Sequence, residues 1–213
     1  MSSLIITIPV KGPARSKTRL ADLLSLESRT NLVLRMFERT LRFFCREFPQ
    51  YPILVVTDSE LMANIAQEFG ASIFMESQAD GLNAAASRAA QRNRAAGYDK
   101  QLLVPADIAL LSTREINQLI SAAEKGSSVV VSRAKDGGTN GLLTSPPDVI
   151  DFSFGEQSSA SHIEHAALAG IKHTLLEQDL MSRDIDFPED LFWLPDGYSA
   201  WAKPYQFGAE DVA

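Results

Sequence analysis

The sequence predicts an α/β fold with a mostly parallel sheet. Short β-rich apolar runs alternate with segments whose apolar residues recur at helical spacing. Most of these runs are apolar throughout, as in strands buried on both faces, and turn residues such as Gly, Pro, Asp and Ser follow them. A chain of 213 residues, 45% hydrophobic and without repeats or linkers, fits one domain over 1–213. Its tail is expected to be irregular from about residue 193.

The first half of the chain predicts three strands and two helices. Residues 4–10 are a compact apolar run, typical of a buried strand. A Gly-Pro loop follows, and residues 25–48 carry one apolar stripe at helical spacing. Residues 53–57 (ILVVT) predict a second strand, and Asp and Ser caps then introduce a helix over 61–69. A glycine ends that helix, and 72–75 form a short strand.

The second half continues the alternation. Residues 83–96 are alanine-rich and end at a glycine, which predicts a helix. Residues 101–104 predict a strand that runs into Pro-Ala-Asp, 113–125 a helix, and 128–131 (SVVV) a central strand. A polar loop over 132–140 comes next. The last elements are expected at 141–144 (strand), 159–169 (helix) and 171–176 (strand).

Composition excludes several classes of protein. The formal net charge of -7 argues against a general nucleic-acid binder, although a local cation cluster can still bind one small polyanion. No apolar stretch approaches the ~20 residues that span a bilayer, and the amino terminus lacks the order of a secretory signal. The single cysteine, Cys45, cannot form an intramolecular disulfide, which fits a reducing compartment. We therefore expect a cytoplasmic protein that binds neither membrane nor nucleic acid.

A cation cluster follows the first predicted strand. IPVKGPARSKTRLA (8–21) contains Lys11, Arg15, Lys17 and Arg19 but neither a dinucleotide-binding fingerprint nor a Walker A loop. Such a loop can fold around a triphosphate through backbone N–H groups and charge-assisted hydrogen bonds. A solvated basic loop is the alternative. The position at the carboxyl end of a strand, where ligands bind in open α/β sheets, favours the ligand.

Three aspartates form a candidate Mg²⁺ site. Asp107 follows the strand at 101–104, and RDIDFPEDL places Asp184 and Asp186 two residues apart. In an extended segment those two side chains project to the same side. Carboxylate oxygens are the ligands that Mg²⁺ prefers, usually together with substrate phosphates. Helix capping is a serious alternative for Asp186.

Glycine- and hydroxyl-rich segments at 137–143 (GGTNGLL) and 152–162 (FSFGEQSSASH) are further candidates. The second opens a helix, whose free N–H groups can hold an anion, although Ser158 can equally be an ordinary N-cap. His162 and His165 in that helix lack a zinc-protease pattern, so a zinc site is not expected. Asn83 either caps its helix or reads a base edge, and the sequence alone favours the cap.

In this order, these segments resemble the CofC/FbiD family, the guanylyltransferases of coenzyme F420 biosynthesis. The resemblance spans almost the whole chain and rests on the following segments: IPVKGPARSKTRLA, DGLNAA, VPADIALL, GGTNGLL, FSFGEQSSASH and RDIDFPEDL. It implies a single nucleotidyltransferase domain of the nucleotide-diphospho-sugar transferase type. It also implies a reaction of GTP with 2-phospho-L-lactate, phosphoenolpyruvate or 3-phosphoglycerate that releases pyrophosphate.

The resemblance also implies roles for individual residues. Lys17 and Asp107 would be catalytic, and Asp107, Asp184 and Asp186 would hold Mg²⁺. The remaining implied contacts are Lys11, Arg15, Lys17, Gly81 and Asn83 with the nucleotide, and Thr139, Gly155 and Ser158 with the acid. The aromatic tail and the resemblance to the family suggest a homodimer, which the hydrophobic periodicity of the sequence does not demonstrate.

Two departures from the family pattern concern the identity of the acid. Asp136 precedes Gly137 and Gly138 where many relatives have a Gly-Thr-Gly-Thr-Asn loop, and Phe187 replaces a common threonine. A molybdopterin or sugar nucleotidyltransferase of the same fold is the enzymatic alternative, but the chain lacks the glycine-rich opening loop typical of those enzymes. A nucleotide-binding subunit without catalysis is the alternative from another class.

Overall fold

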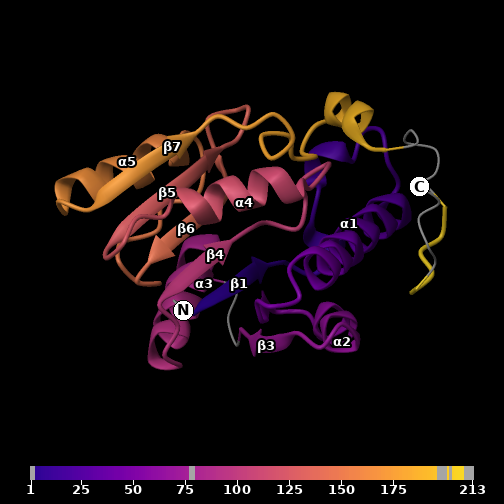
Figure 1. The fold of residues 1–213 in the computed structure, drawn as a ribbon. Helices are drawn as coiled ribbons and strands as arrows, with labels where there is room; N and C mark the ends of the chain where they lie inside the picture. Colours follow the sequence, from indigo (N-terminus) through magenta and orange to yellow (C-terminus); the bar gives the residue numbers. More distant parts are fainter. Residues whose placement is uncertain (1–2, 77–79, 196–200, 202, 209–213) are drawn as a thin grey trace.

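The computed structural model describes residues 3–76, 80–195, 201 and 203–208. The chain builds one seven-stranded sheet in the order β3-β2-β1-β4-β6-β5-β7 (Figure 1). Its strands are β1 (Leu4–Pro9), β2 (Ile53–Thr57), β3 (Ser72–Met75), β4 (Lys100–Leu103), β5 (Ser128–Arg133), β6 (Thr139–Ser145) and β7 (Lys172–Leu176). Only β6 is antiparallel to its neighbours. The predicted α/β fold with a mostly parallel sheet is confirmed.

Helices cover both faces of the sheet. They are α1 (Leu26–Glu47), α2 (Glu60–Glu68), α3 (Leu82–Ala95), α4 (Thr113–Ala122) and α5 (Ser158–Leu168). Apolar side chains of α1, α2 and α4 pack on one face, while alanines of α3 and α5 pack on the other. The small alanines let α3 lie close to the strands. None of the helices among the described residues is both long and apolar enough to cross a bilayer.

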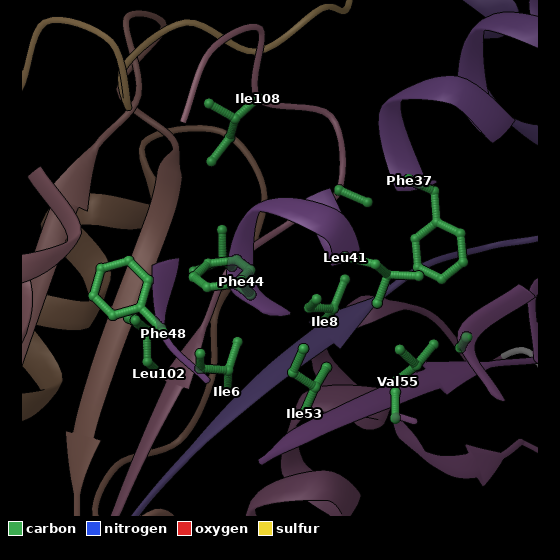
Figure 2. Packing of buried hydrophobic residues seen from close by; sticks show 14 of the residues in the cluster. Ile6, Ile8, Phe37, Leu41, Phe44, Phe48, Ile53, Val55, Leu102 and Ile108 are labelled. Carbon is green, nitrogen blue, oxygen red and sulfur yellow. The ribbon is translucent and has the colours of Figure 1, made fainter. Parts of the chain in front are cut away.

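The larger core cluster lies between α1 and the sheet. Ile6 and Ile8 of β1 belong to the same cluster as Phe37 and Phe44 of α1, and all four are fully buried (Figure 2). Alternate residues of a strand point to opposite faces, so Ile5 packs instead with the alanines of α3. β1 is thus buried on both faces, as its sequence predicts.

Most predicted elements lie within a few residues of their predicted bounds, but the loops differ. The cation loop contains two short 3₁₀ helices, Pro13–Arg15 and Thr18–Leu20. β6 begins at Thr139, two residues earlier than predicted, because this polar segment pairs with β5. α4 ends at Ala122, three residues earlier than predicted. A further 3₁₀ helix, η3 (Pro188–Trp193), follows the aspartate pair.

An isolated β-bridge joins two distant segments beyond the carboxyl end of β4. Ile108 pairs with Asp184 in antiparallel orientation. The N–H of Ile185 donates to the carbonyl of Asp107 (3.0 Å), and the N–H of Ala109 donates to the carbonyl of Arg183 (2.7 Å). This bridge places residues 184–186 beside Asp107, although 77 positions separate Asp107 from Asp184 in the sequence.

The predicted irregular tail falls partly outside the described residues. Its described portion packs against α1. Tyr205 donates through its hydroxyl to Glu38 (2.7 Å), and Gly208 donates its N–H to the same carboxylate (3.1 Å). Arg39 lies over the ring of Trp201. The tail therefore adds to the cover of α1 rather than to the sheet.

Candidate functional site

A cavity of about 330 Å³ crosses the carboxyl ends of four parallel strands, β3, β2, β1 and β4. This size lies within the range of small-molecule sites. The strand order reverses at β1, and the crevice outside such a switch point is where open α/β sheets bind ligands. Residues that follow each of the four strands line it. They include Lys11, Arg15, Lys17, Asp58, Glu76, Gly81, Asp107 and Asp186.

The first loop supplies exposed cations to this cavity. Lys11 and Arg15 both line it, and 64% of the Arg15 side chain is exposed. Arg15 forms an ion pair with Asp58, which also accepts the N–H of Gly12 through Oδ1 (3.2 Å). Asp58 thus ties the loop after β1 to the end of β2. The loop is anchored by a specific partner and is not simply a solvated basic segment.

Lys17 lies in a different environment from its neighbours. Its side chain is only 7% exposed, and Nζ donates to Asp107 Oδ2 (2.5 Å) and Asp186 Oδ1 (2.9 Å). Burial opposes the charge of Lys17, but the two carboxylates more than offset that effect and raise its pKa above the usual value. Lys17 is therefore a permanent cation that holds two predicted metal ligands together.

Asp184 completes the group of aspartates. Burial, followed by the charges of Asp107 and Asp186, raises the pKa of Asp184 to about 6, although a hydrogen bond from Asn140 Nδ2 (3.1 Å) opposes this shift. Arg19 donates to the outer oxygen of Asp186 (3.1 Å) from an exposed position. The negative charge of the three aspartates therefore exceeds the positive charge of Lys17 and Arg19.

The three aspartates fit a divalent cation in their chemistry. Their oxygens are the donors that Mg²⁺ selects, and a cation would relieve the repulsion that raises the pKa of Asp184. In the described part of the chain, no group of three or more His, Cys, Asp or Glu side chains is already arranged around one metal position. Lys17 occupies the space between Asp107 and Asp186. Mg²⁺ binding therefore stays a prediction.

The two residues expected at the nucleoside behave differently. Gly81 lines the cavity as the N-cap of α3, with a φ of 92° that favours glycine. Asn83 is not among the lining residues. Its amide bonds the backbone of Phe154 in both directions: Nδ2 donates to the carbonyl (3.3 Å), and Oδ1 accepts the N–H (2.6 Å). Asn83 is therefore not the N-cap that the sequence favoured, because Gly81 holds that position, and its amide fastens the 152–158 segment to α3.

The residues expected at the acid lie around a buried histidine. Ser158 Oγ donates to Thr139 Oγ1 (3.0 Å), and Thr139 Oγ1 contacts His162 Nδ1 (3.1 Å). His162 Nε2 accepts the N–H of Ser153 (3.0 Å). Full burial, with a smaller contribution from His165, lowers the pKa of His162 to about 4, so the ring is neutral.

A second set of bonds joins the glycine-rich loop to the start of α5. Ser159 bonds the carbonyl of Gly137 through both N–H (3.2 Å) and Oγ (2.8 Å). Gly137 has a φ of 90°, and an added Cβ would lie 2.5 Å from atoms of Gln157. The positive φ favours glycine here, whereas the flexible end of the Gln157 side chain can shift to admit a Cβ. Gly155 accepts the N–H of Ser158, so Thr139, Gly155 and Ser158 form one unit, outside the lining of the 330 Å³ cavity.

Asp58 and Glu76 were missed as site candidates by the sequence reasoning, which treated Asp58 only as a helix cap. Both line the cavity, and both directly follow predicted strands. Ligands bind at the carboxyl ends of parallel strands, and this rule had indicated both the loop after β1 and Asp107. It applies equally to Asp58 and Glu76. Ser59, not Asp58, is the N-cap of α2. Cys45 is half-buried with a pKa raised by burial, which fits a structural thiol.

Several solved structures superpose on most of this chain. A chain described as a nucleotide-diphospho-sugar transferase from Desulfovibrio desulfuricans superposes with a TM-score of 0.69 at 18% identity, covering 88% of this chain and 84% of that one. A nucleotidyl transferase from Methanothermobacter superposes with a TM-score of 0.64 at 15% identity, covering 90% of this chain and 95% of that one. At these identities the likeness shows the fold alone.

Sequence comparison is more specific. The chain is 42% identical over 186 residues to a 3-phospho-D-glycerate guanylyltransferase of Colwellia psychrerythraea, covering 87% of this chain and 88% of the relative. It is 31% identical to a phosphoenolpyruvate guanylyltransferase of Rubrobacter xylanophilus, covering 89% of this chain and 92% of the relative. Residues 4–197 match the family described as guanylyl transferase CofC like. The ordered motifs, the nucleotidyltransferase fold and this match agree, and the chain belongs to the CofC guanylyltransferase family.

Proposed function

We propose that this protein transfers GMP from GTP to the phosphate of a small phosphorylated acid, releasing pyrophosphate, in coenzyme F420 biosynthesis. The observation that carries the proposal is the cavity at the switch point. Lys11 and Arg15 line it as exposed cations beside the buried Lys17 and the carboxylates of Asp107 and Asp186. A triphosphate needs such cations, and a metal–phosphate complex needs such carboxylates.

The chemistry requires positioning more than proton transfer. A phosphate oxygen of the acid attacks the α-phosphorus of GTP in line, and the bond to the pyrophosphate oxygen breaks. The attacking phosphate is already an anion, so no general base is needed. Lys11 and Arg15 hold the triphosphate, and Lys17 fixes the positions of Asp107 and Asp186. Bound Mg²⁺, held by Asp107, Asp184 and Asp186, would supply charge neutralisation between the two anionic substrates.

Among the three acids of the relatives, we propose 3-phospho-D-glycerate as substrate. The support is the 42% identity to a relative named for that acid, against 31% and 29% for relatives named for phosphoenolpyruvate and 2-phospho-L-lactate. We propose that the unit of Thr139, Gly155 and Ser158 holds the acid. The hydrogen bond from Ser158, at the start of α5, to Thr139 fixes the positions of these two side chains.

Pyrophosphate release tests this proposal directly. Purified protein is incubated with GTP, Mg²⁺ and each acid separately. We expect release that depends on acid and metal and is fastest with 3-phospho-D-glycerate. GTP binding without release for any acid would contradict the enzymatic proposal and favour a nucleotide-binding subunit. Faster release with phosphoenolpyruvate or 2-phospho-L-lactate would overturn the choice of acid alone.

We also propose that the protein is cytoplasmic and forms a homodimer. The single half-buried cysteine suits a reducing compartment. Phe192, 85% exposed in η3, and Phe187, 42% exposed, are large apolar side chains on one short segment. Sedimentation of the protein with and without a Phe192→Ser change tests whether this segment supports a dimer.

A further inference from the structure

The cavity has two chemically different ends. One end, after β1 and β4, carries the cations of the first loop, together with Asp107 and Asp186. The other end, after β3 and at the first turn of α3, is lined by Glu76, Gly81, Leu82 and Ala85. The phosphates of a nucleotide belong at the cationic end. The base then belongs at the β3 end, against the apolar Leu82 and Ala85.

The span between these ends suits a nucleotide. β3, β2, β1 and β4 are consecutive in the sheet. Adjacent strands lie about 4.8 Å apart, so three intervals separate the β3 end from the β4 end by about 14 Å. This length accommodates a nucleoside with its α-phosphate near Asp107 and its base near Glu76.

Glu76 is held in place at the β3 end. Its side chain is 12% exposed, and Oε1 accepts Nη2 of Arg88 (2.6 Å). Arg88, on α3, also donates to Asp80 (2.9 Å). Among the described residues no hydrogen bond reaches the second oxygen, Oε2. The other lining carboxylate near this end, Asp58, differs because both of its oxygens bind the first loop.

We propose that Glu76 selects guanine, an inference that rests on the proposed function. A carboxylate accepts both N1–H and the 2-amino group of guanine, and hydrogen bonds to a charged group are among the stronger ones. Adenine presents an unprotonated N1 at that edge, which a carboxylate repels. Hypoxanthine keeps N1–H but lacks the 2-amino group. Xanthine has a 2-oxo group, which needs a donor instead.

The test compares Glu76→Gln with Glu68→Gln, a matched change at an exposed glutamate at the end of α2. Each variant and the wild type are assayed by kcat/KM with GTP, ITP and XTP at saturating acid. We expect the wild type to prefer GTP over ITP by about 10-fold or more, and Glu76→Gln to lower this preference toward unity. The glutamine amide can donate to the 2-oxo group, so the XTP/GTP ratio should rise about 10-fold or more in Glu76→Gln alone.

The gain with XTP excludes a variant that is merely less stable. A loss of folded protein lowers kcat/KM for every nucleotide by the same factor, so it leaves the ratios between nucleotides unchanged. Unchanged GTP/ITP and XTP/GTP ratios in Glu76→Gln would overturn the assignment. If the wild type releases no pyrophosphate with GTP, the proposed function fails separately. Calorimetric titration of the same proteins with GTP, ITP and XTP then still decides the role of Glu76.

Discussion

Replacing Lys17 with methionine removes the buried cation but keeps most of the volume of its side chain. In the wild-type protein Nζ donates to Asp107 (2.5 Å) and Asp186 (2.9 Å). In the variant, Asp107 and Asp186 repel each other without a cation between them. Asp184 also loses the nearby positive charge of Lys17. We therefore expect loss of both stability and activity.

The magnitude follows from the exposure of the partners. Removing one partner from a fully buried ion pair costs about 3–5 kcal/mol. The side chains of Asp107 and Asp186 are 32% and 35% exposed, so water screens part of their repulsion. We expect about 2 kcal/mol, which lowers the Tm of a chain of this length by about 4–8 °C.

Arg19→Met is the matched control for this change. Arg19 also binds Asp186 (3.1 Å), but its side chain is 56% exposed. Exposed pairs contribute about 0–1 kcal/mol, so Tm should fall by no more than about 2–4 °C. Thermal unfolding is measured for both variants in EDTA and in Mg²⁺. We expect Mg²⁺ to raise the Tm of Lys17→Met more than that of the wild type, because freed carboxylates bind the cation better.

Equal Tm values for Lys17→Met and the wild type in EDTA would refute this account of the buried cation. A Tm loss that Mg²⁺ does not reduce would argue against the metal role of Asp107 and Asp186. The same variants are assayed for pyrophosphate release. KM for GTP should rise more than KM for the acid in Lys17→Met, because Lys17 positions the carboxylates beside the triphosphate. An unchanged KM for GTP would contradict this role.

Three further changes probe the aspartates and the buried histidine. Asp107→Asn should lower turnover by at least about 100-fold while the circular dichroism spectrum stays native, and near-normal turnover would rule out its metal role. Asp184→Asn should raise stability in EDTA by about 1–3 kcal/mol, because burial and two neighbouring carboxylates disfavour the charge of Asp184; chemical denaturation at pH 7.5 measures this, and a lower stability would contradict it. His162→Gln tests the buried ring: its folded pKa of about 4 lies below the ordinary 6.5, so the neutral ring is stable above pH 6.5 and stability is lost as the pH falls toward 4. At pH 5 this loss is about 2 kcal/mol relative to pH 7.5, and the denaturation midpoints of the variant should lack that share of the pH dependence.

Part of the site follows from position along the chain. Lys11, Arg15 and Asp107 lie in the loops that follow predicted strands, and the carboxyl ends of parallel strands meet at one edge of a sheet. Asp58 and Glu76 obey the same rule and could have been found by it. The position of Asp58 before a predicted helix indicated a cap instead, because Asp is typical of capping positions.

Other features depend on contacts between distant segments. The pairing of Ile108 with Asp184 places Asp184 and Asp186 beside Asp107. No local sequence pattern predicts an isolated bridge of this kind. Residue type and spacing did not distinguish Lys17 from Lys11, since both are lysines in one polar loop, and only the family resemblance implied a catalytic role for Lys17. Burial distinguishes them: Lys17 is enclosed between two carboxylates, whereas Lys11 is exposed.

The sequence by itself determined the alternation of strands and helices, the burial of β1 on both faces and the ordered motifs of the family. These properties are local, because they depend on side-chain periodicity and residue type within short segments. Tertiary structure alone decided which charges meet, including Lys17 with Asp107 and Asp186, and Glu76 with Arg88. Ion pairs depend on distance and burial in space, which hydrophobic periodicity does not encode.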